Sequence, residues 1–307
     1  MELLTIMVKY PSYIKLYEEG KLKERVETAY NILKECTVCP HQCKVDRLKG
    51  NKGLCKTTDK LTIASFFPHQ GEELPIRGIN GSGTIFISNC NMSCVFCQNW
   101  DISQKGEGYE YYPEEVADIM LFLQEKGCHN INWVTPSHVV PQLLKATYIA
   151  VKKGLSIPIV YNTSSYDSIR TLRLLENIVD IYLPDFKFAD DKLSIRYSKT
   201  ANYTKIAINS IKEMHRQVGD LKTNSKGVAY KGLLVRHLVM PNNVSNSIKA
   251  LNLLKTISPN IHVNVMKQYY PSYKSNNYPE LNRTLYEEEF KEVLNYARKL
   301  RLKVIRD

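Results

Sequence analysis

The stretch "GTIFISNCNMSCVFC", residues 83–97, joins a short apolar run to three cysteines. The run GTIFIS has the length and β-branched composition of a buried strand. Cys90, Cys94 and Cys97 follow it with C-x3-C-x2-C spacing. Three thiolates in one loop can hold a [4Fe-4S] cubane and leave one iron open to a small chelating molecule. The alternative is a closed zinc or ferredoxin-type loop, which needs a fourth ligand.

From this stretch to the end of the chain, apolar runs alternate with amphipathic segments, which is typical of βα units around a parallel sheet. The predicted strands are residues 83–88, 131–135, 157–162, 179–186, 232–239 and 262–267. The predicted helices are residues 113–127, 139–153, 166–176, 189–215, 245–256 and 284–301. The pattern therefore predicts an α/β fold, a partial (β/α)6 TIM-like barrel over residues 81–307.

The segment before the barrel has a different pattern. It begins with a predicted helix over about 21–35 and ends with a short predicted strand pair within 61–78. Between them lie four cysteines with C-x2-C-x3-C-x11-C spacing, Cys36, Cys39, Cys43 and Cys55. Four thiolates complete either a tetrahedral zinc site or an auxiliary [4Fe-4S] cluster, and the spacing leaves both open. A segment this small needs a bound metal to fold, so we predict a cysteine-rich, metal-binding N-terminal subdomain with short strands over 1–80.

Composition excludes several classes of protein. With 307 residues, 43% of them hydrophobic, the chain can bury a large core and is neither disordered nor fibrous. A net charge of +11 permits an anionic partner, but the lysines are scattered, so nucleic acid is the less favoured partner. Neither a signal peptide nor a membrane helix is predicted. We therefore expect a cytoplasmic protein that makes no membrane contact, in which clustered thiols bind metal rather than form disulfides.

The motif CNMSCVFC, residues 90–97, resembles the C-x3-C-x-φ-C motif of the radical S-adenosylmethionine (SAM) superfamily, with Phe96 at the aromatic position. The chain further resembles the PflX-type homologues of pyruvate formate-lyase activating enzyme. That resemblance includes the segments GEELPIRGINGSGTIFISNCNMSCVFCQNWDIS, VTPSHVVPQ, PIVYNTSSYDS, DIYLPDFKFADD, VRHLVMPNN and VMKQYYP.

The resemblance implies an oxidoreductase in which a [4Fe-4S] cluster binds SAM and cleaves it reductively to a 5′-deoxyadenosyl radical. That radical takes hydrogen from a substrate, such as the backbone glycine of a glycyl-radical enzyme. A one-electron donor such as flavodoxin or ferredoxin would supply the electron. The alternatives are radical SAM modification of RNA, a peptide or a small metabolite, and, from another class, a non-catalytic module that binds metal or nucleic acid.

In such a barrel the working residues lie at the carboxyl ends of the strands. The resemblance places Thr135, with His138, near the SAM amino group, and Asn162 and Thr163 beside its methionyl group. Asp185 and Lys187 alternate with Phe186 and should point into the same lumen. Arg236 stands among apolar residues, where a charge requires an anionic partner, and the resemblance implies the SAM carboxylate or ribose as the group it contacts. The remaining expected contacts are Phe96, Gln268 and Tyr269.

Several other polar residues have competing interpretations. His69, Glu72 and Glu73 either line the mouth of the barrel or form a solvated turn. His237 should face away from the lumen and pack in the core. Cys128, outside both cysteine groups, is expected to be a small buried residue.

Overall fold

The computed structural model describes residues 11–305. A ten-stranded sheet forms its centre, in the order β10-β9-β8-β6-β5-β4-β2-β1-β3, with β7 paired to β8. The strands are β1 (Leu61–His69), β2 (Ser82–Ile87), β3 (Tyr109–Tyr111), β4 (Ile131–Val134), β5 (Ile159–Thr163), β6 (Ile181–Pro184), β7 (Lys222–Thr223), β8 (Ala229–Leu238), β9 (His262–Met266) and β10 (Lys303–Val304).

The central part of the sheet is parallel. β2, β4, β5, β6, β8 and β9 pair in parallel with their neighbours, and they correspond to the six strands predicted from the sequence. Their side chains are buried on both faces, as in β5, where all five residues are buried. Near-continuous apolar runs are expected for strands covered in this way. The α/β partial-barrel prediction is therefore confirmed.

Most of the predicted helices are present, with shorter bounds. The helices of the barrel are α4 (Pro113–Glu125), α5 (Val140–Lys152), α6 (Ile169–Leu174), α7 (Asp191–Ser198), α8 (Tyr203–Val218), α9 (Ser247–Lys255) and α10 (Glu287–Lys299). The single helix predicted over 189–215 was wrong. Lys199 and Asn202 have φ angles of 55° and 54°, which end α7 and allow α8 to begin in a new direction.

The N-terminal segment is part of the same sheet. Helices α1 (Tyr13–Glu18) and α2 (Lys21–Asn31) precede the four-cysteine loop, and β1 then pairs antiparallel with β2 and β3. The predicted strand pair within 61–78 was wrong, because its second half forms a short helix, α3 (Leu74–Arg77). Pro75 lies in the first turn of α3, where its missing N–H costs nothing. A division of the chain near residue 80 stays a prediction.

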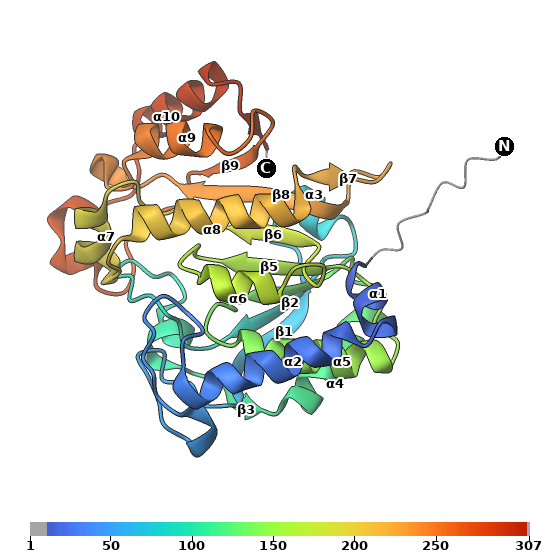
Figure 1. Cartoon of the computed structure of the whole chain (residues 1–307). Coiled ribbons are helices and arrows are strands. Elements are labelled where there is room, and N and C mark those ends of the chain that lie inside the picture. Colours follow the sequence, from blue (N-terminus) through green and yellow to red (C-terminus); the bar gives the residue numbers. More distant parts are fainter. Residues whose placement is uncertain (1–10, 306–307) are drawn as a thin grey trace.

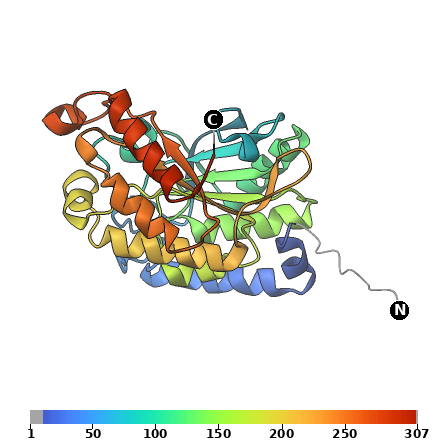
Figure 2. The same ribbon diagram turned by 90° about the horizontal axis from the view of Figure 1, so that it is seen from above.

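Helices cover one face of the curved sheet. Figure 2 shows α2, α5, α8 and α9 lined up along that face, with the strands on their other side. In Figure 1 the carboxyl ends of the parallel strands point to the left, toward α7 and the loop that follows β9. None of the helices within residues 11–305 is long and apolar enough to cross a membrane.

Candidate functional site

The loops at the carboxyl ends of the parallel strands enclose a cavity of about 310 Å³. The three cysteines of the second cluster line it together with most of the predicted SAM contacts, all except His138 and Tyr269: Cys90, Cys94, Cys97, Phe96, Thr135, Asn162, Thr163, Asp185, Lys187, Arg236 and Gln268. The structure thus brings together residues from six strand ends that lie up to 178 positions apart in the chain. What each residue binds remains a prediction.

The three cysteines lie in the loop that leaves β2. Asn89, with a φ of 66°, turns the chain sharply after the strand. The backbone N–H of Met92 donates to Cys90 Sγ at 3.3 Å, and the hydroxyl of Ser103 lies 3.1 Å from Cys97 Sγ. Hydrogen bonds of this kind stabilise thiolates that ligate an iron–sulfur cluster.

The charge near these sulfurs also suits an anionic cluster. Burial raises the pKa of the Cys90 thiol to about 12, and burial raises that of Cys94 as well, while the ammonium of Lys187 opposes both shifts. Thiols in this setting stay neutral unless a metal replaces their protons. The three sulfurs, their donors and the facing ammonium therefore fit a [4Fe-4S] cluster whose open iron would face the cavity.

No group of three His, Cys, Asp or Glu side chains within residues 11–305 stands in the geometry that holds one metal ion. This holds for the three-cysteine loop and for the four-cysteine loop alike. In a cubane each cysteine binds a different iron, so its sulfurs stand further apart than the ligands of a single ion. The absence of a single-ion group among the described residues therefore does not conflict with a cluster.

A network of four charged side chains forms part of the wall of the same cavity. Asp185 Oδ2 lies 2.5 Å from Lys187 Nζ, and Asp185 Oδ1 lies 2.7 Å from Arg236 Nε. Arg236 Nη1 is 3.3 Å from Glu72 Oε2, and its Nη2 donates to Asn162 Oδ1 at 2.5 Å. All four charged side chains are between 7% and 16% exposed. Arg236 therefore has the anionic partners that its apolar setting requires.

Burial and charge act against each other in this network. Burial raises the pKa of the Asp185 carboxyl, but Arg236 and Lys187 outweigh burial, and the net effect lowers that pKa. Burial lowers the pKa of the Lys187 ammonium, but Asp185 and Cys94 reverse the shift and raise it. At Glu72, burial prevails over Arg236, and the pKa of its carboxyl is raised. Asp185 and Lys187 are therefore both charged near neutral pH.

The ends of β4 and β5 are held together by backbone and hydroxyl groups. Thr135 has a φ of 64°, and its N–H donates to the carbonyl of Asn162 at 2.9 Å. The Thr163 hydroxyl donates to Asp167 Oδ2 at 2.6 Å and lies 2.9 Å from the Ser137 hydroxyl. The Thr163 hydroxyl is thus engaged within the protein, whereas the amide of Asn162 faces the cavity beside Arg236.

Phe96 is buried and braced by other rings. Its ring centroid lies 5.9 Å from that of Phe188 and 6.2 Å from that of Tyr269. Tyr269 is itself buried, and its hydroxyl donates to the carbonyl of Leu281 at 2.7 Å. The cavity lining includes Gln268 but not Tyr269, so the prediction of a ligand contact for Tyr269 was wrong. Tyr269 supports Phe96 instead.

Three polar residues took positions that the sequence left open or misplaced. Glu72 and His69 line the cavity, and Glu72 is too buried to belong to a solvated turn. His138 was expected near the SAM amino group, but it lies on the four-cysteine side, where its ring contacts the Ser88 carbonyl and its own carbonyl accepts from Arg47. His237 is packed as predicted, between the Phe186 carbonyl and the Ser247 hydroxyl.

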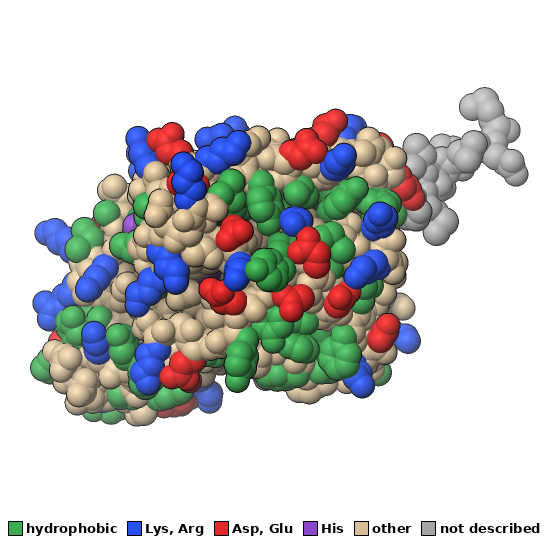
Figure 3. Space-filling view, turned by 90° about the horizontal axis from the view of Figure 1, so that it is seen from below, with side chains coloured by type: hydrophobic (Ala, Val, Ile, Leu, Met, Phe, Trp, Pro, Cys, Tyr) green, Lys and Arg blue, Asp and Glu red, His purple; other side chains and the backbone are tan. Residues whose placement is uncertain are grey.

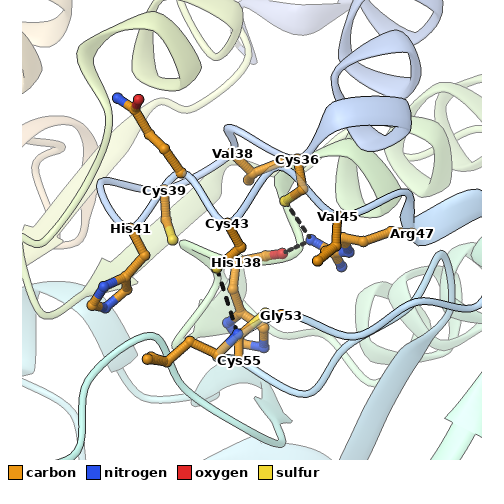
Figure 4. A pocket seen from close by; sticks show the side chains of 12 residues that line it. Cys36, Val38, Cys39, His41, Cys43, Val45, Arg47, Gly53, Cys55 and His138 are labelled. Atoms are coloured by element: carbon orange, nitrogen blue, oxygen red, sulfur yellow. Dashed lines mark hydrogen bonds between the residues drawn. The ribbon is translucent and has the colours of Figure 1, made fainter.

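The four-cysteine loop encloses a small cavity of its own. Figure 4 shows the side chains of Cys36, Cys39, Cys43 and Cys55 around it, with Arg47 and His138 beside them. Burial, together with the other three cysteines, raises the pKa of the Cys39 thiol to about 12. The backbone N–H of Leu54 donates to Cys43 Sγ at 3.5 Å. Sulfur-directed donors are thus present here as well.

On the face seen in Figure 3, basic side chains predominate on the left, and basic and acidic side chains alternate on the right, where hydrophobic side chains gather between them.

Comparison with known proteins agrees with the geometry of the site. Residues 84–232 match the family model of the Radical SAM superfamily. The chain is 36% identical over 295 residues to the uncharacterized protein MJ0674 of Methanocaldococcus jannaschii, a match that covers 92% of this chain and 80% of that protein.

Two solved structures are similar to parts of this chain. A radical SAM methyltransferase from Sphaerobacter thermophilus has a TM-score of 0.50 and 13% identity, over 80% of this chain and 76% of that one. SuiB of Streptococcus suis bound to S-adenosylmethionine has a TM-score of 0.47 and 11% identity, over 70% of this chain and 47% of that one. At these identities the likeness concerns the fold alone.

Proposed function

The chain belongs to the radical SAM superfamily, and from this premise we propose that it uses the cavity at the strand ends to cleave SAM and abstract hydrogen from a substrate. One observation carries the proposal: the three-cysteine loop and the Asp185–Lys187–Arg236–Glu72 network line the same cavity. When bound, the [4Fe-4S] cluster supplies the electron that breaks SAM into methionine and a 5′-deoxyadenosyl radical.

The charged network suits the methionyl end of SAM, which carries a carboxylate, an ammonium and a sulfonium. Lys187, held by Asp185 at 2.5 Å, can donate to the carboxylate. Asp185 and the Asn162 amide oxygen can accept from the ammonium. Glu72 and Asp185 also place negative charge opposite the positive sulfonium. In our proposal, the backbone carbonyl or the hydroxyl of Thr135 also accepts a hydrogen bond from the SAM ammonium.

The remaining lining residues suit the nucleoside. Phe96 presents a ring fixed by Phe188 and Tyr269, a surface against which adenine can pack. The Gln268 side chain offers both a donor and an acceptor at the cavity edge. Gln98 Nε2 donates to the Gln268 carbonyl at 3.0 Å and so fixes that edge to the three-cysteine loop.

The size of the cavity favours a large substrate that enters by a narrow segment. About 310 Å³ lies at the lower end of the range for small-molecule sites, so bound SAM leaves little room. An extended protein loop could reach the radical at the mouth, near His69 and Gln268. Together with the PflX-type resemblance, this supports hydrogen abstraction from a backbone glycine, as in the activation of a glycyl-radical enzyme.

The proposal includes two further requirements. The four cysteines at 36, 39, 43 and 55 bind a second metal group, because they line one cavity. A one-electron donor of the flavodoxin or ferredoxin type reduces the protein.

The test is anaerobic reconstitution with iron and sulfide, followed by SAM and dithionite. We expect the broad absorbance of a [4Fe-4S] cluster and dithionite-dependent 5′-deoxyadenosine. Cys94→Ala should abolish 5′-deoxyadenosine, whereas Cys128→Ala, at a buried cysteine outside both groups, should not. A fully loaded wild-type protein that forms no 5′-deoxyadenosine would refute the proposal.

Substrate class is tested by deuterium transfer. Candidate glycyl-radical enzymes with deuterated glycine should label 5′-deoxyadenosine. Labelling from RNA, a peptide or a small metabolite in place of such a protein would refute the glycine assignment and leave the SAM chemistry standing.

A further inference from the structure

The four-cysteine loop packs directly against the three-cysteine loop. His41 Nε2 donates to the carbonyl of Asn91 at 2.7 Å, and Asn91 lies between Cys90 and Cys94. In Figure 1 the blue segment that contains residues 36–60 lies beside the teal segment that follows β2. The two metal-binding loops therefore have no other element of the fold between them at this contact.

A second contact joins the same two loops through the interior. Arg47 Nη1 donates to the carbonyl of His138 at 2.7 Å, and His138 Nε2 lies 3.1 Å from the carbonyl of Ser88, two residues before Cys90. The two sites thus share a wall.

Arg47 indicates that the four-cysteine site holds an anion. Its side chain is 1% exposed, and it donates to the carbonyls of Thr58 and His138 and, at 3.8 Å, to Cys36 Sγ. Among the described residues, no carboxylate forms a salt bridge with it. A buried guanidinium without a counter-charge is costly. Metal-bound thiolates next to Arg47 would provide that charge.

Resting on the function proposed above, we propose that Cys36, Cys39, Cys43 and Cys55 hold a fully ligated [4Fe-4S] cluster that relays single electrons to the cluster at Cys90, Cys94 and Cys97. Direct contact with the three-cysteine loop favours a cluster over zinc, because a cluster can exchange electrons with its neighbour and zinc has no redox chemistry.

The electron balance of the relay is simple. A reduced flavin or iron–sulfur carrier protein loses one electron, and the four-cysteine cluster gains it. That cluster then returns to its oxidised state as the electron passes to the three-cysteine cluster, and no bond forms or breaks in the transfer. Arg47 beside Cys36 and the Leu54 N–H on Cys43 stabilise the added negative charge, because positive charge and hydrogen bonds at sulfur raise a cluster's reduction potential.

The outer side of the loop is open to a carrier. Cys43 is half-buried, whereas the other three cysteines are 6% to 7% exposed. Leu54, next to Cys55, is 54% exposed, and Lys52 and Lys56 beside it are also exposed. An electron could therefore enter near Cys43 and Leu54 and leave on the buried side toward Cys90.

The first measurement uses the wild-type protein reconstituted with iron and sulfide in the presence of zinc. We expect about eight iron atoms and about eight sulfides per chain, and no zinc. In the dithionite-reduced protein, SAM should alter the electron paramagnetic resonance (EPR) signal of one cluster only, and magnetic coupling should broaden both signals. About four iron atoms and one zinc would overturn the proposal, and so would two signals without coupling.

The second measurement uses Cys43→Ala, at the least buried of the four cysteines, with Cys128→Ala as the matched control. Cys43→Ala should lose the signal that does not respond to SAM and keep the signal that does. Reduction of the SAM-responsive cluster by a photoreduced flavodoxin, followed by freeze-quench EPR, should slow by at least an order of magnitude. Reduction by dithionite, which is small enough to reach the open site, should not slow.

The outcomes separate the two proposals. Equal rates with flavodoxin in Cys43→Ala and in the wild type would overturn the relay, even if 5′-deoxyadenosine still forms. Loss of 5′-deoxyadenosine from a wild-type protein with both clusters would instead overturn the proposed function. If Cys43→Ala does not fold, the metal content and magnetic coupling of the wild type still decide the identity of the second group.

Discussion

Replacing Lys187 with methionine tests the proposed recognition of the SAM carboxylate. The lysine is 16% exposed, and its ammonium is fixed 2.5 Å from Asp185 Oδ2 on the cavity wall. Methionine keeps most of the side-chain volume and removes the charge. A hydrogen bond to a charged group contributes about 1.5–3 kcal/mol. We therefore expect the Kd for SAM to rise roughly 10- to 150-fold.

The free energy of unfolding should fall by somewhat less than the free energy of SAM binding. Removing one partner of a buried ion pair costs about 3–5 kcal/mol when the other charge is left alone. Here Asp185 keeps Arg236 at 2.7 Å, so the free energy of unfolding should fall by only about 1–2 kcal/mol. The fall should be visible in thermal denaturation as a small decrease in Tm.

The assay is isothermal titration of SAM into anaerobically reconstituted protein, with cluster content verified by absorbance. Lys192→Met, an exposed lysine on α7, is the matched control and should bind SAM like the wild type. A Lys187→Met variant with a complete cluster and unchanged SAM affinity would refute the placement of the carboxylate at Lys187.

Three further predictions concern stability and the second site. Asp180 is fully buried, and burial raises the pKa of its carboxyl to about 6 from 3.8. Its protonated form therefore stabilises the fold below about pH 4, and this stabilisation is lost as the pH rises through 6. In chemical denaturation, the free energy of unfolding of Asp180→Asn should therefore decrease by up to about 3 kcal/mol less than that of the wild type between pH 4 and 7. Asp118→Asn, at an exposed site, should show the same pH dependence as the wild type. A Cβ at Gly83 would lie 2.6 Å from the Asn130 carbonyl oxygen, so Gly83→Ala should destabilise the protein by about 2–3 kcal/mol. Gly154→Ala, where only the positive φ is strained, should cost about 1 kcal/mol. Equal decreases in Tm for the two variants would contradict this packing argument. A Cβ at Gly53 would lie 2.9 Å from Cys43 Sγ, so Gly53→Ala should weaken the EPR signal that does not respond to SAM. Asn51→Ala, on the same loop, should keep that signal. A full signal in Gly53→Ala would argue against Cys43 as a ligand.

The barrel and the cavity lining could be predicted because both follow from local patterns. Strands buried on both faces give apolar runs, and the alternation of Asp185, Phe186 and Lys187 fixes which side chains face the lumen. A cavity at the carboxyl ends of parallel strands then collects residues from separate parts of the chain. The sequence pattern could therefore name the lining without any knowledge of distances.

The features that the sequence did not predict depend on contacts between distant segments or on backbone angles. Glu72 is buried because Arg236, 164 residues later, lies beside it, and no local signal reports that pairing. His138 turns toward Ser88, a contact set by tertiary packing. The break between α7 and α8 requires a positive φ at Lys199, and a lysine in the sequence does not predict a positive φ.

The charged network has a consequence for the response of the enzyme to salt. Asp185, Glu72, Lys187 and Arg236 carry two negative and two positive charges when ionised, so the network is formally neutral before SAM arrives. The cost of removing these groups from water is incurred when the chain folds, and SAM then exchanges partners with groups already in position. Because the ion pairs are shielded from solvent, their strength depends little on the Debye length. SAM affinity should accordingly change little with ionic strength, unlike that of an enzyme that attracts its ligand through exposed charge.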